Sequence, residues 1–171
     1  GELRPAELAE PEPGPGEIGL EISVCGVCRT DLHLIDGELE GARLPLIPGH
    51  QIVARVGSLG SGSGRFKIGD RVGVPWLAWA CGECRYCETG RENLCPRARF
   101  TGYTVNGGYA ERTVADERFC FALPEGLTDL EVSPLLCGGM IGHRALRIAG
   151  DGERLGLYGF GSSAHILCQI A

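Results

Sequence analysis

The sequence has 171 residues, enough for one domain of ordinary size and part of a second. Its 16 basic and 22 acidic residues give a net charge of −6, and no cluster of Lys and Arg stands ready to bind nucleic acid or an anionic membrane. No apolar run approaches the roughly 20 residues that span a bilayer, and the N-terminus lacks a signal-peptide layout, so we expect a cytoplasmic protein without membrane or nucleic-acid partners.

The first three quarters of the chain predict a mainly β domain. The 28 glycines and ten prolines are spread along the sequence and favour a fold with many tight turns. Apolar and alternating runs predict strands at residues 18–24, 51–56, 71–75 and 109–115. The Gly- and Ser-rich stretch 57–64 lies between two of these strands, which favours a surface hairpin loop over a linker. We therefore expect a small β-barrel or sandwich.

A helix and a glycine turn are expected toward the C-terminus. Thr128 and Glu131 have the spacing of a capping box, and apolar residues then recur with helical spacing as far as residue 148. Residues 155–158 predict a buried strand, which leads into a G-x-G-x-x-A fingerprint at residues 159–164. Strand, turn and helix in this order are typical of the beginning of a dinucleotide-binding domain, which we expect to be incomplete in this chain.

Four of the nine cysteines lie within residues 81–95, in the pattern C-x2-C-x2-C-x7-C. They are Cys81, Cys84, Cys87 and Cys95. Four thiolates at this spacing can close a tetrahedral shell around Zn²⁺, as in structural zinc sites, and such a lobe folds because it binds the metal. The alternatives are an iron–sulfur cluster, a disulfide pair and free cysteines. The spacing favours zinc, because the ferredoxin pattern has x3, not x7, before its last Cys-Pro.

Chemically active side chains gather at further places. Within six residues stand a thiol, a guanidinium, a hydroxyl, a carboxylate and an imidazole, on Cys28, Arg29, Thr30, Asp31 and His33. Pro48-Gly49-His50 adds an imidazole, and Pro134-Leu135-Leu136-Cys137 adds a thiol. Two thiolates and one imidazole suit a zinc site with an open fourth position. Spacing alone does not join these residues, since they are far apart in sequence.

These motifs, together with Gly107-Gly108-Tyr109-Ala110-Glu111 and Tyr158-Gly159-Phe160-Gly161, stand in an order that resembles zinc-dependent medium-chain alcohol dehydrogenases over nearly the whole chain. The resemblance implies a GroES-like β-barrel catalytic domain over residues 1–134, with the zinc lobe at about 81–95. A connecting helix and the beginning of a Rossmann α/β domain would follow over residues 135–171. It also implies reversible oxidation of a small-molecule alcohol to an aldehyde or ketone with NAD or NADP, by a parent enzyme that is homo-oligomeric, with this fragment inactive alone.

The same resemblance implies a role for each candidate site residue. A catalytic zinc would be bound by Cys28, His50 and Cys137, and a second, structural zinc by the lobe. Thr30 and His33 would relay the alcohol proton to solvent, and Asp31 would fix the tautomer of His50. Trp76 would form a wall of the substrate pocket, with plain core packing as the alternative. The cofactor would be held by Arg29, Gly159, Gly161, Ser162 and Ala164.

Two positions depart from the family pattern. Gln51 stands where Glu commonly follows the zinc-binding histidine, and Ile141 stands where relatives often have Thr. The acidic residue that would select NAD or NADP lies roughly 20 residues past the fingerprint, beyond Ala171. A polyol or amino-alcohol dehydrogenase of the same family and a non-catalytic zinc-binding module are the alternative functions; metal storage alone would need neither Thr30 nor His33.

Overall fold

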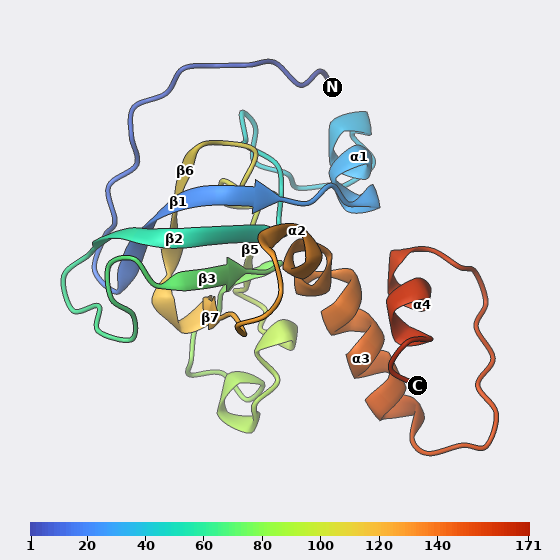
Figure 1. The fold of residues 1–171 in the computed structure, drawn as a ribbon. Helices are drawn as coiled ribbons and strands as arrows, with labels where there is room; N and C mark the ends of the chain where they lie inside the picture. Colours follow the sequence, from blue (N-terminus) through green and yellow to red (C-terminus); the bar gives the residue numbers. More distant parts are fainter.

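A computed structural model describes residues 1–171 and contains seven strands and four α-helices (Figure 1). The strands are β1 (Glu17–Cys25), β2 (Ile52–Leu59), β3 (Arg71–Val74), β4 (Leu77–Trp79), β5 (Arg99–Phe100), β6 (Arg112–Asp116) and β7 (Phe121–Ala122). The helices are α1 (Arg29–Asp36), α2 (Asp129–Val132), α3 (Gly138–Ala149) and α4 (Ser162–Leu167). No helix has both the length and the apolar character that crossing a membrane requires.

Five strands form one antiparallel sheet in the order β6-β1-β2-β3-β7, and β4 pairs with β5 in a second sheet. The edge strands β6 and β7 are consecutive in the chain, joined by four residues that include the 3₁₀ helix η3 (Glu117–Phe119). A flat sheet of five strands would hold its edges about 19 Å apart, because neighbouring strands are about 4.8 Å apart. The short link therefore requires the sheet to curl, which gives the expected mainly β barrel.

The four strands expected from the sequence are all present, with one shift in position. The hairpin of β2 and β3 carries the Gly- and Ser-rich stretch at its turn, as predicted. The strand expected at 109–115 begins three residues later, at Arg112. Residues 107–109 instead donate their backbone N–H groups to the carbonyl groups of Ile47, Gly49 and Pro48, at 2.7, 2.9 and 3.0 Å. This segment is thereby bound to the loop that carries His50.

The barrel core comes from alternate residues of the central strands. Ile18 and Leu20 of β1 face the same side as Ile52, Ala54 and Val56 of β2, and all five are at most 2% exposed. A two-residue period of this kind places one face of each strand in the core. The core therefore fixes the positions of the loops at the ends of β1 and β2, where Cys28 and His50 lie.

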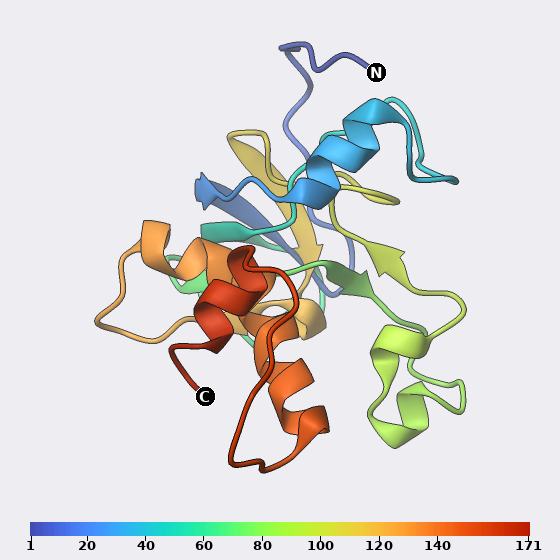
Figure 2. The same cartoon turned by 90° about the vertical axis from the view of Figure 1, so that its right-hand side faces the viewer.

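The four-cysteine segment forms a separate lobe that projects from the barrel beyond β4 and β5 (Figures 1 and 2). It contains two short 3₁₀ helices, η1 (Cys87–Thr89) and η2 (Glu92–Leu94). Neither hydrophobic core cluster includes a residue of this lobe. Apolar packing therefore contributes little to the stability of the lobe.

The connection from the barrel to α3 begins with the predicted capping box. Thr128 Oγ1 accepts a hydrogen bond from the Glu131 backbone N–H at 3.3 Å, and the Glu131 carboxylate accepts one from the Thr128 N–H at 2.8 Å. The 3₁₀ helix η4 (Ser133–Leu136) follows, and Leu136 packs in a cluster with Val132 and with Val53 of β2. This packing holds the turn that carries Cys137 against the barrel.

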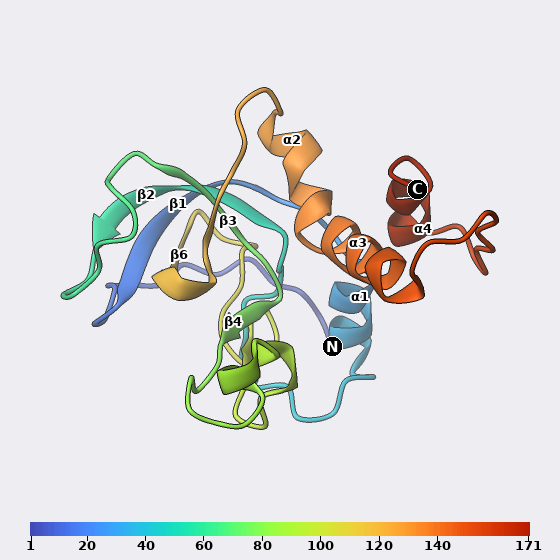
Figure 3. The same cartoon turned by 90° about the horizontal axis from the view of Figure 1, so that it is seen from below.

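Helices α3 and α4 lie side by side, away from the sheet (Figures 1 and 3). Their close approach depends on Gly142, because a Cβ at this position would stand 3.1 Å from the Ser163 carbonyl oxygen and 3.4 Å from Leu167 Cβ. A contact of that length leaves no room for a larger side chain.

The prediction of a buried strand at residues 155–158 is wrong. The segment is irregular, and Leu155 and Tyr158 are 46% and 103% exposed. A strand needs a neighbouring strand to accept and donate its backbone hydrogen bonds, and no strand lies anywhere in residues 135–171. The glycine turn and the helix after it are nevertheless formed, as α4.

Candidate metal centres

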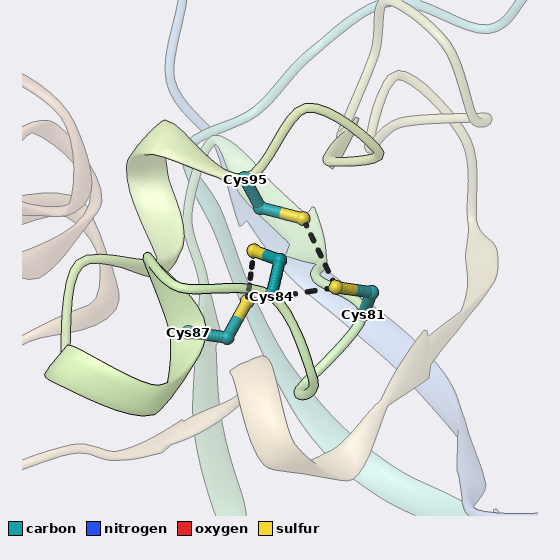
Figure 4. Close-up of side chains that lie close together, drawn as sticks. All are labelled: Cys81, Cys84, Cys87 and Cys95. Atoms are coloured by element: carbon teal, nitrogen blue, oxygen red, sulfur yellow. Dashed lines mark hydrogen bonds between the residues drawn. The ribbon is translucent and has the colours of Figure 1, made fainter.

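The thiols of the lobe cysteines converge on one point (Figure 4). The Sγ–Sγ distances are 3.9 Å for Cys81 and Cys87, 3.5 Å for Cys84 and Cys87, and 3.6 Å for Cys81 and Cys95. All four sulfur atoms lie within 4.8 Å of one another. Sulfur atoms bound tetrahedrally at about 2.3 Å from a zinc ion would be roughly 3.8 Å apart. The lobe therefore has the shape that a single tetrahedral metal ion requires.

These distances decide among the alternatives for the lobe. All nine cysteines are free, and the sulfur atoms are well beyond the roughly 2.05 Å of a disulfide bond. A multi-iron cluster distributes its cysteine ligands over different iron atoms, which separates them more than the ligands of one ion. The lobe fits one ion with four thiolate ligands, and zinc is the ion most typical of such a set.

The lobe favours the metal-binding thiolate form at Cys81 and disfavours it at Cys87, whose pKa burial raises to about 12. The pKa of Cys81 is lowered to about 6, first by a backbone N–H of Glu83 that donates to the sulfur and then by the Arg97 guanidinium. Arg97 in turn pairs with the Glu83 carboxylate. Arg97, which follows the lobe in the chain, thus contacts two residues at the beginning of the lobe.

A second centre forms where three loops meet. Cys28 precedes α1, His50 precedes β2 and Cys137 precedes α3. The two thiol sulfurs are 3.8 Å apart although the residues are 109 positions apart in the chain, and the ligand atoms of all three lie within 4.8 Å of one another. His50 is 1% exposed, whereas both cysteines are partly exposed. The arrangement therefore offers three ligands with no fourth His, Cys, Asp or Glu grouped with them.

Asp31 lies directly behind His50 and accepts four hydrogen bonds while only 2% exposed. Its Oδ1 accepts from the Gly49 backbone N–H at 3.2 Å and from His50 Nδ1 at 3.1 Å. Its Oδ2 accepts from the Cys28 backbone N–H at 2.8 Å and from the Tyr109 hydroxyl at 3.0 Å. With its proton on Nδ1, His50 has the Nε2 lone pair available for a metal.

The loop that carries His50 requires glycine at residue 49. Gly49 has a φ of 94°, in the left-handed region. A Cβ there would stand 2.6 Å from the Tyr109 ring and 2.7 Å from the Cys25 sulfur. The Pro48-Gly49-His50 motif is thus explained by close packing under the metal ligand.

The ionisable groups of this centre shift one another's pKa values. Burial acts to lower the pKa of His50, but its hydrogen bonds to Asp31 and Cys137 outweigh burial and raise it to about 10. Burial acts to raise the pKa of Asp31, but the hydrogen bond from His50 outweighs it, and the pKa falls below its usual value. For Cys28, hydrogen bonds from Thr30 and the charge of His50 overcome burial and lower the pKa. Without metal, the centre therefore holds a proton on His50 that a metal ion must displace.

Thr30 and His33 extend from this centre along one face of α1, since residues three apart are neighbours on a helix. The Thr30 hydroxyl lies 3.6 Å from Cys28 Sγ. His33 is partly exposed, and its Nδ1 contacts the Glu38 carboxylate. Glu38 is not among the residues expected from the sequence, because it follows the left-handed turn at Gly37 and no local pattern predicts its return toward His33.

Trp76 stands beside the second centre within a group of aromatic rings. Its ring centroid is 4.9 Å from that of His50, edge to face. It also stacks on Phe100 at 5.3 Å and on Tyr103 at 5.6 Å. The same side chain thus packs against its neighbours and borders the metal ligands.

The residues expected to bind a cofactor lie in two separate segments of the chain. Arg29 is exposed at the beginning of α1. Gly159, Gly161, Ser162 and Ala164 belong to the turn and first residues of α4. A Cβ on Gly138 would stand 2.6 Å from Ser162 Oγ, so the fingerprint turn lies against the residue that follows Cys137.

The two positions that depart from the family pattern differ in environment. Gln51 is 5% exposed, and its backbone carbonyl accepts a hydrogen bond from the Ser133 hydroxyl at 2.8 Å. Ile141 is 57% exposed on α3. Gln51 is therefore enclosed next to a candidate ligand, whereas Ile141 faces solvent.

Tyr109 is a further residue of this centre without an expected role, although its motif contributed to the resemblance. Its hydroxyl reaches Asp31 across 78 positions of sequence. No local sequence pattern predicts such a contact, because it depends on how the loop after residue 106 packs onto residues 47–49.

The alcohol dehydrogenase GroES-like domain family matches residues 14–125. Mycobacterium tuberculosis AdhA, named as a probable alcohol dehydrogenase, is 48% identical over 178 residues, and an alcohol dehydrogenase of Geobacillus stearothermophilus is 45% identical over 168 residues. The matches cover 100% and 96% of this chain but 51% and 50% of those relatives. The chain thus spans about half the length of the curated relatives it matches.

Solved structures of dehydrogenases are similar to this chain over most of its length. A cinnamyl alcohol dehydrogenase of Sorghum bicolor superposes with a TM-score of 0.89 at 32% identity, over 97% of this chain and 50% of that one. A Helicobacter pylori enzyme solved with NADP(H) has a TM-score of 0.84 at 29% identity, over 92% of this chain and 48% of that one. A Pyrobaculum aerophilum alcohol dehydrogenase solved with cobalt and zinc also has a TM-score of 0.84, at 26% identity, over 96% of this chain and 51% of that one.

Proposed function

Because the chain belongs to the alcohol dehydrogenase GroES-like domain family, we propose that it forms the metal-binding part of a zinc-dependent enzyme that oxidises an alcohol to an aldehyde or ketone. The observation that carries the proposal is the centre of Cys28, His50 and Cys137, with Asp31 behind it and one side open. A site for storing or structurally fixing a metal would close its fourth position with a protein ligand.

We assign one zinc ion to each centre, two per chain. The lobe has four thiolate ligands and no open position, so its ion is structural. Zinc at the second centre would act as a Lewis acid on the alcohol oxygen. The protonated state of His50 in the metal-free protein means that loading this centre releases a proton.

The remaining residues of the second centre handle the proton and the carbon skeleton. Thr30, next to the open position, accepts the hydroxyl proton of the alcohol and donates its own to His33. His33 is partly exposed and paired with Glu38, so it passes the proton to solvent. Trp76 borders the same opening, where its ring would contact the carbon chain of the alcohol and keep water from the reacting carbon.

A nicotinamide cofactor, NAD or NADP, would take up the hydride. Arg29 and the turn of Gly159, Gly161, Ser162 and Ala164 are the residues we assign to its pyrophosphate. The turn lies against Gly138, next to Cys137, so a dinucleotide held there would approach the open position. We accordingly assign residues 1–134 to the catalytic domain and 135–171 to the connecting helix and the beginning of the dinucleotide-binding domain.

The substrate is a small alcohol with an apolar body. Relatives include a cinnamyl alcohol dehydrogenase of Arabidopsis thaliana and a probable mannitol dehydrogenase of Fragaria ananassa. The three stacked rings of Trp76, Phe100 and Tyr103 beside the second centre favour an apolar or aromatic alcohol over a polyol. A non-catalytic zinc module is disfavoured, because it would not need Thr30 and His33 aligned along α1.

The proposal is tested on the whole protein to which this chain contributes, by following reduced nicotinamide with benzyl alcohol, ethanol and mannitol. We expect oxidation of the first two, and complete loss of it in Cys28→Ala, while Cys168→Ala, which removes an exposed cysteine that belongs to neither centre, retains it. Equal rates for the wild type and Cys28→Ala would refute the assignment.

A further inference from the structure

We propose that Tyr109 is a positioning residue for the metal ligand His50 and acts through Asp31. The inference rests on the proposed function, because it assumes that a metal occupies the centre of Cys28, His50 and Cys137. It assigns a task to a residue for which neither the spacing nor the resemblance implied a role.

Tyr109 is tied to the His50 loop in three ways. Its backbone N–H donates to the Pro48 carbonyl at 3.0 Å. Its ring packs so closely on residue 49 that only glycine fits there. Its hydroxyl donates to Asp31 Oδ2 at 3.0 Å, on the carboxylate that holds His50 Nδ1. The residue thus contacts both the support of the ligand and the loop that carries it.

Of the four donors to Asp31, the Tyr109 hydroxyl is the one that a substitution can remove without removing a metal ligand. Cys28 and Gly49 donate to Asp31 through backbone N–H groups, which remain whatever the side chain. His50 is the ligand itself. Tyr109 supplies the fourth donor, from a segment outside α1 and outside the His50 loop.

Loss of this donor would loosen the orientation of the imidazole. Asp31 Oδ2 would keep one partner, the Cys28 N–H, and the carboxylate could turn away from the plane in which it now accepts from His50. A ligand whose Nδ1 partner is mobile samples orientations in which Nε2 points away from the metal. The effect should therefore appear as weaker metal binding at this centre and no change at the lobe.

The experiment compares Tyr109→Phe with Tyr103→Phe in the full chain, loaded with Zn²⁺ or Co²⁺ alone. Phenylalanine keeps the ring and removes only the hydroxyl. The Tyr103 hydroxyl donates to the Glu40 carbonyl and not to Asp31, although its ring belongs to the aromatic group beside the same centre. Competition with a chromophoric chelator measures both sites in each molecule, and the lobe serves as an internal standard for folding.

We expect Tyr109→Phe to weaken zinc binding at the second centre by about tenfold, the lower end of what loss of an outer hydrogen-bond partner causes. The lobe affinity should stay unchanged, and the visible spectrum of cobalt at the second centre should change. The His50 Nδ1–H resonance of the zinc-loaded protein should also shift. Tyr103→Phe should alter none of these.

The outcomes separate the inference from the function on which it rests. Unchanged affinity and spectrum in Tyr109→Phe would overturn the inference alone, as would equal weakening in both variants, which would indicate a general packing effect. If the wild type holds metal only at the lobe, both the assigned catalytic centre and the inference are overturned. A variant that loses its lobe metal as well would also count against the inference, because it would show a role in folding.

Discussion

Asp31 offers the sharpest test of how the second centre is built. Replacing it by Asn preserves its volume but turns one of its two oxygens into an NH₂ group. In either orientation of the amide, that group faces a backbone N–H that cannot accept from it, of Gly49 in one case and of Cys28 in the other. One backbone hydrogen bond is lost and the others no longer have a charged acceptor, in a side chain that is 2% exposed.

Hydrogen bonds to charged groups contribute about 1.5–3 kcal/mol each, so the loss of one and the weakening of the others in Asp31→Asn should lower the free energy of unfolding by about 2–4 kcal/mol. Urea unfolding followed by tryptophan fluorescence measures this loss. The matched control is Asp36→Asn, an exposed position on the same helix, which should change stability by no more than about 0.5 kcal/mol. A loss below about 1 kcal/mol in Asp31→Asn would contradict the buried four-donor arrangement.

Three further predictions follow from other contacts. Because His50 in the metal-free protein has a pKa raised to about 10, its protonation stabilises the fold fully below its unfolded pKa of about 6.5. The stability of the metal-free protein should therefore fall as the pH rises from about 6.5 to about 10, which urea titration measures. Zinc affinity at this centre should rise about tenfold per pH unit over the same range, which chelator competition measures. Gly142→Val should separate α3 from α4 and speed hydrogen exchange in residues 162–167, whereas Ala145→Val on the exposed side of α3 should not; equal exchange in both would contradict the close approach. Arg71→Met removes hydrogen bonds to Asp129, Pro124 and Leu127, at 2.7, 3.1 and 2.9 Å. It should lower the free energy of unfolding in urea by about 2–3 kcal/mol. The control Arg55→Met breaks one exposed contact and should lower it by well under 1 kcal/mol.

Local patterns in the sequence predicted those features that depend on neighbouring residues. The lobe was readable from spacing, because Cys81, Cys84 and Cys87 occupy one tight turn region that can point three thiols at one ion. The capping box at Thr128 and the core strands were readable for the same reason. Each of these features is decided within about fifteen residues of chain.

Features that depend on distant segments were not readable in this way. Cys28 and Cys137 meet because η4 packs on β2, and no periodicity encodes that contact; only the resemblance to a family suggested it. The strand expected at residues 155–158 failed because strands also require a neighbour, which hydrophobicity does not report. Tyr109 was missed because its partner lies in another part of the chain.

Native mass spectrometry of the zinc-loaded protein measures directly whether both centres bind zinc. We expect two zinc ions per chain in the wild type, one in Cys137→Ala because the second centre loses a ligand, and one in Cys84→Ala because the lobe loses one. Losses in these two variants should fall on different sites, so Cys84→Ala should also lose stability in the lobe while Cys137→Ala should not. A wild type with a single zinc ion, or a Cys137→Ala variant that retains two, would refute the assignment of one zinc ion to each centre.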